Sequence, residues 1–247
     1  MMKIFPLSEG AFTIDKTKVF VPFELEQDDL QARPIGSLLV EVQPFVVITE
    51  KDIILIDTGL GFTKNNQLQI HQNLLSVGIT PEKITKVLMS HLHKDHSGGV
   101  SKKDRLGNYS LAFENAKYYV QKAEFNYAME KGFPSYMTEE ISILENHPNV
   151  IWLNGDEIID GYIHCKITSA HSKFHQVFWI KENDEIIFFG GDDAPQIQQM
   201  KTKFIAKYDF NGRKCMELRK EWWEQGKTEK WKFLFYHDIK TPVWFHS

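Results

Sequence analysis

Short runs of apolar residues recur along the chain, and they constrain its fold more than any other feature of the sequence. They are rich in Val, Ile, Leu and Phe and are bounded by Gly, Pro or charged residues, a pattern that predicts β-strands. Predicted strands cover residues 18–22, 37–48, 52–56, 86–90, 116–121, 150–153, 162–168, 176–180, 186–189 and 231–235. Predicted helices lie between them, at residues 67–77, 123–131, 138–146 and 215–225.

No internal repeat, low-complexity tract or linker divides this series of strands and helices. An α/β fold in a single domain over residues 1–247 is the simplest account, and a chain of this length buries a sizeable core. The formal net charge of −4 provides no basic surface for a phosphate backbone. We therefore expect no nucleic-acid partner.

The sequence also lacks the signals of membrane insertion and export. No apolar run approaches the roughly 20 residues that span a bilayer, and the first residues do not resemble a signal peptide. We expect a cytoplasmic protein without a membrane partner. The two cysteines, Cys165 and Cys215, are too few for a disulfide framework and are expected to be reduced thiols.

The segment 90–99, Ser-His-Leu-His-Lys-Asp-His-Ser-Gly-Gly, concentrates metal-binding side chains directly after a predicted strand. His91 and His93 are two residues apart, so extended backbone places both rings on one side. Asp95 and His96 follow, where two glycines indicate a sharp turn. Imidazole and carboxylate groups suit zinc, iron or manganese. A solvated polar loop is the alternative, but this density of donors behind an apolar strand favours a metal site.

Three later donors share the same position at the end of an apolar strand. His171 follows the predicted strand 162–168, Asp192 follows 186–189, and His237 follows 231–235. Sites in buried sheets are usually built at such ends. Asp193 is an alternative to Asp192. Four other histidines lack a comparable context and are expected to be ordinary: His71, His147, His164 and His246.

From about residue 38 to residue 238 the chain resembles the metallo-β-lactamase-fold hydrolases, whose motifs occur in order. The resemblance implies an αββα four-layer sandwich, with two mixed β-sheets packed face to face and helices outside. It implies that seven residues hold two metal ions, three at the first ion, three at the second and one bridging both: His91, His93 and His171; Asp95, His96 and His237; and Asp192. Asp57 would support the metal loop by hydrogen bonds, and His175 would support the ligands.

The resemblance also implies a mechanism and a cofactor. Two divalent ions, with zinc the first choice and iron or manganese as alternatives, would share a hydroxide that attacks an ester, a lactone or a related bond of a small molecule. Asp95 would be a ligand and also the catalytic proton acceptor. Relatives are often dimers, so a homodimer is left open.

Alternatives to a hydrolase that acts on an ester or a lactone remain, both among hydrolases and among other classes of protein. A persulfide dioxygenase with a single iron shares the cluster, a phosphodiesterase uses the same ions, and a binding protein could retain the fold. N-acyl homoserine lactonases carry a tyrosine three residues after the bridging aspartate, where this chain has Pro195. Aromatic stretches at 20–25, 125–136 and 222–223 could line a substrate pocket or pack in the core. The substrate is therefore left open.

Overall fold

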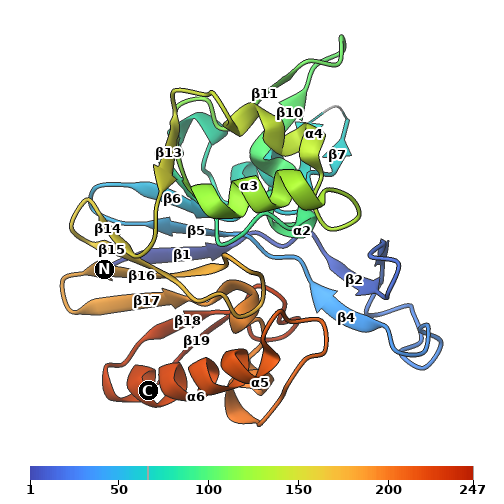
Figure 1. Ribbon diagram of the computed structural model, residues 1–247, viewed down its shortest axis with the longest axis vertical. Coiled ribbons are helices and arrows are strands. Elements are labelled where there is room, and N and C mark those ends of the chain that lie inside the picture. Colours follow the sequence, from blue (N-terminus) through green and yellow to red (C-terminus); the bar gives the residue numbers. More distant parts are fainter. Residues whose placement is uncertain (66, 247) are drawn as a thin grey trace.

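Two six-stranded β-sheets form the centre of the structure, a computed structural model that describes residues 1–65 and 67–246 (Figure 1). The first sheet has the strand order β1 (Lys3–Pro6), β5 (Phe45–Ile48), β6 (Ile53–Ile56), β9 (Lys86–Leu88), β12 (Lys117–Gln121) and β13 (Val150–Leu153). The second has the order β14 (Glu157–Ile159), β15 (Ile163–Ile167), β16 (Gln176–Glu182), β17 (Glu185–Phe189), β18 (Lys232–Leu234) and β19 (Val243–Phe245). Both sheets mix parallel and antiparallel pairs.

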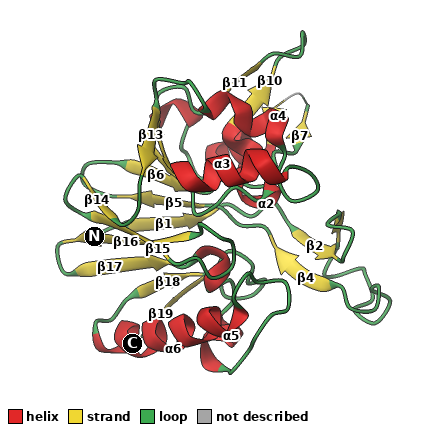
Figure 2. Cartoon of the chain, viewed as in Figure 1, coloured by secondary structure: helices red, strands yellow, loops and turns green. Residues whose placement is uncertain are grey.

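Alternation of side chains along the strands produces three apolar layers. In β5, Phe45 faces the second sheet and shares a buried cluster with Phe178, whereas Val46 belongs to the cluster under the helices on the outer side. Helices α1 (Gln69–Ser76) and α3 (Lys122–Lys131) pack on that outer face, and Figure 2 shows α3 over the strands of the first sheet. Helix α6 (Gly212–Thr228) covers the second sheet with Trp222 and Trp223. The predicted αββα four-layer sandwich is confirmed.

The predicted strand 37–48 is wrong as a single element, because it is divided between two sheets. Its first part is β4 (Leu38–Glu41), which pairs with β2 (Ala11–Ile14), which in turn pairs with β3 (Phe20–Pro22). This three-stranded sheet, here called the arm (residues 11–41), projects from the body in Figure 1. Pro44 stands between the two parts, and its missing N–H interrupts a sheet ladder. The second part, β5, then pairs with β6 as expected.

The helices also differ from the prediction in length. Helix α1 ends just before Gly78, whose φ of 77° favours glycine. The predicted helix 138–146 is α4 (Thr138–Ile141) followed by a 3-10 turn (Ser142–Leu144), and Pro148 prevents further extension. Several short elements were not predicted, because they are too short for a clear period: β1, β2, β7 (Thr63–Lys64), β8 (Gln67–Leu68), β10 (Ser101–Lys103), β11 (Tyr109–Leu111), β14, β19, α2 (Lys94–Ser97) and α5 (Ile197–Lys201).

Within residues 1–65 and 67–246, no helix combines the length and the apolar character required to cross a bilayer.

Candidate metal centre

The predicted metal ligands converge at one end of the sandwich, where strands of both sheets end. His91 and His93 follow β9, and α2 carries Asp95 and His96. His171 lies in the loop after β15. The remaining two follow neighbouring strands of the second sheet, Asp192 in the 3-10 turn after β17 and His237 after β18. Their donor atoms form two groups.

The first group consists of three imidazole nitrogens and one carboxylate oxygen, all within 4.8 Å of one another. His93 Nδ1 lies 2.9 Å from His91 Nε2 and 3.2 Å from His171 Nε2. Asp192 Oδ2 lies 3.2 Å from His171 Nε2. Four donors on one zinc ion at tetrahedral geometry are separated by about 3.3 Å. The first group therefore fits a single ion.

The second group consists of Asp95, His96 and His237, and the other oxygen of Asp192 faces it. Asp192 Oδ1 lies 3.1 Å from His96 Nε2 and 3.0 Å from His237 Nε2. Despite these short distances, His96 Nε2 and Asp192 Oδ1 are both buried and neither forms a hydrogen bond with the described residues. Buried polar atoms of this kind call for an unseen partner. A metal ion between them satisfies both, so the residues present fit a second ion.

Hydrogen bonds on the outer side orient these rings. Four imidazoles have an oxygen partner within 3.0 Å of Nδ1: His91 with the Ser90 hydroxyl, His96 with Asp57, His171 with Asp209, and His237 with the carbonyl oxygen of Glu41. When Nδ1 donates its proton outward, the lone pair of Nε2 points into the site. This arrangement is typical of histidines that bind a metal.

Asp57 lies where the sequence predicted a supporting carboxylate. It is fully buried, and its Oδ1 accepts the backbone N–H of Ser90 at 2.7 Å. Its Oδ2 accepts the Ser90 hydroxyl at 2.7 Å and lies 2.8 Å from His96 Nδ1. Asp57 has a φ of 55°, which a non-glycine residue adopts only under constraint. One carboxylate thus holds both the start of the loop that carries the candidate ligands and one imidazole of the second donor group.

His175 and Asp193 form a second supporting pair. His175 Nδ1 lies 3.0 Å from Asp193 Oδ2, and His175 Nε2 accepts the backbone N–H of Asp192 at 3.2 Å. Asp193 Oδ1 also accepts the backbone N–H of His171 at 2.7 Å. Asp193 is thereby turned away from the space between the two donor groups. Asp192, not Asp193, is the carboxylate that faces both.

His91 and Asp192 favour the protonation states of metal ligands, whereas three imidazoles do not. Burial lowers the pKa of His96, His171 and His237, but the charge of Asp192 outweighs it and raises each above its ordinary value. Burial, then the neighbouring His96 and His93, holds the pKa of His91 well below its ordinary value. Burial opposes ionisation of Asp192, but His237 and His96 outweigh it and hold its pKa well below the ordinary value. A neutral imidazole and an ionised carboxylate are the forms that bind cations.

Three residues that support the site were not predicted. Asp209 lies on the loop before α6, 38 positions from its partner His171. Tyr236 stacks on His96 with ring centroids 4.0 Å apart, and its hydroxyl donates to the Asp95 carbonyl oxygen at 2.7 Å. Glu124, buried on α3, accepts the N–H of Leu92 at 3.1 Å. Asp209 and Glu124 are far in the sequence from any predicted donor, and Tyr236, which directly precedes His237, carries no typical metal-binding group, so no local signal distinguished them.

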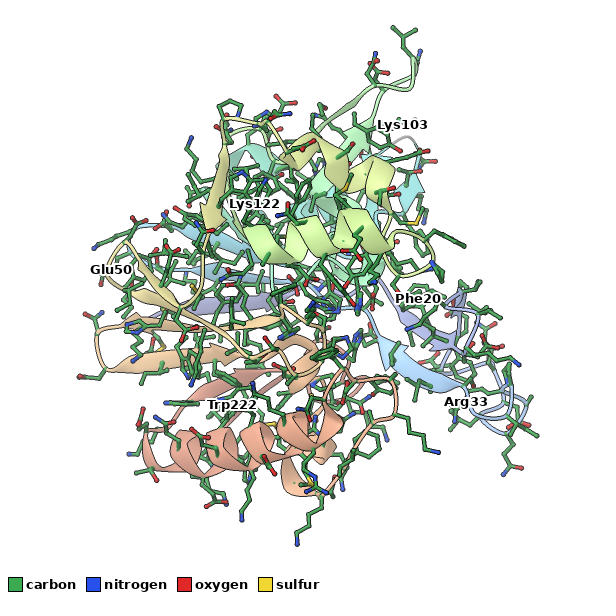
Figure 3. All side chains as sticks on the ribbon, viewed as in Figure 1. Phe20, Arg33, Glu50, Lys103, Lys122 and Trp222 are labelled. Carbon is green, nitrogen blue, oxygen red and sulfur yellow. The ribbon has the colours of Figure 1, made fainter. Side chains whose placement is uncertain are left out.

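Of the aromatic stretches that the sequence analysis singled out, one contributes a residue to the candidate site and another packs in the core. Tyr136 lies beside His93, with ring centroids 5.0 Å apart. Trp222 and Trp223 instead pack in the outer core of the second sheet, where Figure 3 shows Trp222 on α6. The remaining histidines, including His71 and His164, belong to neither donor group among residues 1–65 and 67–246.

Comparison with known proteins places this geometry in context. The family model described as the metallo-beta-lactamase superfamily matches residues 40–192. An N-acyl homoserine lactonase of Bacillus thuringiensis is 27% identical over 227 residues, covering 83% of this chain and 84% of the relative. A probable metal-dependent hydrolase from Staphylococcus aureus has a similar structure, with a TM-score of 0.79, 21% identity, and coverage of 100% of this chain and 92% of that one. The dizinc quorum-quenching lactonase AidC, solved with a product, gives a TM-score of 0.72, 19% identity, and coverage of 99% and 90%.

Proposed function

The chain belongs to the metallo-beta-lactamase superfamily, and from that premise we propose that it is a metal-dependent hydrolase that opens a lactone or a related small-molecule ester. One observation carries the proposal of two ions. The two oxygens of Asp192 face separate donor groups, 3.2 Å from His171 Nε2 and 3.0 Å from His237 Nε2. Similarity to lactonases along 83% of this chain supports the choice of a lactone.

We assign the ligands as the sequence predicted them: His91, His93 and His171 for one ion, Asp95, His96 and His237 for the other, and Asp192 for both. Two adjacent ions held by these residues would supply a Lewis acid for a carbonyl oxygen and a water of lowered pKa. The donors, five imidazoles and two carboxylates, suit zinc.

Asp95 is the side chain assigned to move the proton. Its Oδ2 lies 3.5 Å from His237 Nε2 and 3.7 Å from His96 Nε2, and its side chain is 12% exposed. As the water oxygen bonds to the carbonyl carbon and the ring C–O bond breaks, Asp95 accepts the water proton. It then returns that proton to the leaving alkoxide oxygen.

We also propose zinc at both metal positions, a single domain over residues 1–247, a cytoplasmic location and a small-molecule substrate. Sedimentation velocity, which distinguishes one chain from two, tests whether the protein forms a homodimer.

Metal content and turnover measured together test the proposal. The expected result is about two zinc ions per chain and metal-dependent opening of a lactone or ester. Asp192→Ala should lose both ions and turnover, whereas Asp160→Ala, a carboxylate that pairs with Lys86 instead, should keep them. One iron per chain with oxygen uptake on a persulfide would contradict hydrolysis. Turnover confined to a phosphodiester would contradict the substrate class.

A further inference from the structure

Arg219 is a buried cation in the middle of α6, and it joins two segments that flank the candidate metal centre. The residue is only 1% exposed. Its Nη1 donates to the carbonyl oxygen of Asp193 at 2.8 Å, and its Nη2 donates to the carbonyl oxygen of Phe204 at 2.5 Å. Figure 1 shows α6 beside α5 and along the second sheet. The guanidinium group therefore lies against the turn that carries Asp192.

Both of these hydrogen bonds go to backbone carbonyls and not to carboxylates. The carboxylates of the two joined segments are directed at imidazoles instead. Asp193 Oδ2 lies 3.0 Å from His175 Nδ1, and Asp209 Oδ1 lies 2.9 Å from His171 Nδ1. Taking a cation out of water costs free energy, and replacing a buried charge by an apolar side chain is often neutral or stabilising. What Arg219 provides is the orientation of the two carbonyl groups.

Asp193, the residue after Asp192, is held from several sides. Its Oδ1 accepts the backbone N–H of His171 at 2.7 Å and lies 3.6 Å from the Sγ of Cys215. Cys215 precedes Arg219 by four residues on α6, so both side chains lie on one face of the helix. Cys215 contacts the carboxylate of Asp193 and Arg219 holds its carbonyl oxygen. This face of α6 thus fixes the turn that orients Asp192.

The second carbonyl group belongs to the loop between α5 and α6, and this loop supports His171. Asp209 in the loop contacts His171 Nδ1, and the N–H of Phe210 donates to the His171 carbonyl oxygen at 2.9 Å. Phe204 precedes Asp209 by five residues in the same loop. One guanidinium group therefore fixes the support of His171 relative to the turn of Asp192.

We propose that Arg219 is a positioning residue, which orients Asp192 toward both donor groups and His171 toward the first by clamping two backbone carbonyls. The inference rests on the proposed function, in which these two residues are metal ligands. Arginine suits the task because its planar guanidinium group donates in fixed directions, whereas the ammonium group of lysine is a compact point charge. Arg219 acts through Asp193 and Phe204.

Zinc affinity tests the proposal without requiring turnover. Arg219→Met keeps an apolar stem and removes both donors, so both ions should bind about tenfold or more weakly, because Asp192 serves both. Arg219→Lys keeps the charge and loses the planar fork, and it should weaken both ions about threefold or more. It also keeps the test decisive if Arg219→Met does not fold. Wild-type affinity for both ions in either variant would overturn the proposal.

A cobalt spectrum and two control variants distinguish positioning from a purely structural role. Cobalt(II) in place of zinc reports the geometry of its ligands through its visible absorption, which Arg219→Met should alter. Trp222→Leu removes packing from the same helix, on the part that Figure 3 labels. It should lower the free energy of unfolding and keep the zinc affinity and the cobalt spectrum. Arg213→Met removes an exposed arginine of α6 and should change none of the three. Equal weakening of zinc binding in Trp222→Leu and Arg219→Met would overturn the proposal.

Turnover separates failure of this inference from failure of the proposed function. With both ions loaded, Arg219→Met should lower kcat for a lactone about tenfold and leave KM within about twofold, because the side chain lies behind the turn and not at the substrate. If the wild type binds zinc and opens neither a lactone nor an ester, the proposed function fails, while zinc affinity and the cobalt spectrum still decide on Arg219. If the wild type opens a lactone and Arg219→Met matches it in zinc affinity and kcat, only the positioning role fails.

Discussion

Asp209 holds the outer nitrogen of His171, and its removal tests whether the first donor group binds a metal ion. Its Oδ1 lies 2.9 Å from His171 Nδ1, and its side chain is only 2% exposed. The same loop is fastened to the ligand loop, because the N–H of Phe210 donates to the His171 carbonyl oxygen at 2.9 Å. Asp209→Ala therefore removes one anchor of His171 and leaves all seven donors in the chain.

The expected loss in metal affinity follows from this contact. Deleting the outer partner of a histidine ligand typically weakens metal binding by a factor of about 10–100. At about 1.4 kcal/mol per factor of ten, the change amounts to about 1.4–2.8 kcal/mol at the first ion. Asp209→Asn keeps an oxygen acceptor and loses the charge, so we expect it near the lower end. The second ion should be little affected, since its histidines have other outer partners.

Competition with a chromophoric zinc chelator measures the binding affinity of each of the two ions separately. One step of the titration should weaken in Asp209→Ala, and the other should keep its wild-type position. Asp160→Ala is the control, because it removes a carboxylate whose side chain is 55% exposed and pairs with Lys86. Wild-type curves for both ions in Asp209→Ala would refute the reasoning, since His171 would then not depend on its buried partner.

Three further predictions concern catalysis, packing and pH. Asp95→Ala should lower kcat by about 10²–10⁴-fold without changing the far-UV circular dichroism, and turnover within a few-fold of wild type would exclude Asp95 as proton acceptor. Phe178→Ala empties a fully buried position between the sheets and should cost about 3–5 kcal/mol in urea unfolding, so a loss under about 1 kcal/mol would contradict the packing. Burial, then Glu139, raises the pKa of Glu140 from 4.5 to about 7, so its contribution to stability is complete below pH 4.5 and is lost as the pH rises through about 7. Glu140→Gln should gain stability relative to wild type across that window, and parallel curves of unfolding free energy against pH would contradict the shift.

The sequence predicted most of the strands of the two large sheets, because the signal of a strand is local. The predicted strand 52–56, for example, is observed as the buried strand β6 at Ile53–Ile56. The same reasoning was wrong for 37–48, since a run of apolar residues does not reveal that Pro44 separates two sheets. Of the strands of the arm, β3 and β4 lie within the predicted strands 18–22 and 37–48, whereas β2 is short and was not predicted.

Local spacing was enough to single out a cluster of candidate ligands, and the chemistry of imidazole and carboxylate donors then indicated a metal. Hence His91, His93, Asp95 and His96 could be singled out from the sequence alone. Tertiary structure decided the relations between distant segments. Asp192 and Asp193 are adjacent in the chain, and only the turn after β17 orients the first toward both donor groups and the second toward His175. The contact of Asp209 with His171 is long-range, set by how the loop before α6 packs on the sandwich, and no local pattern encodes it.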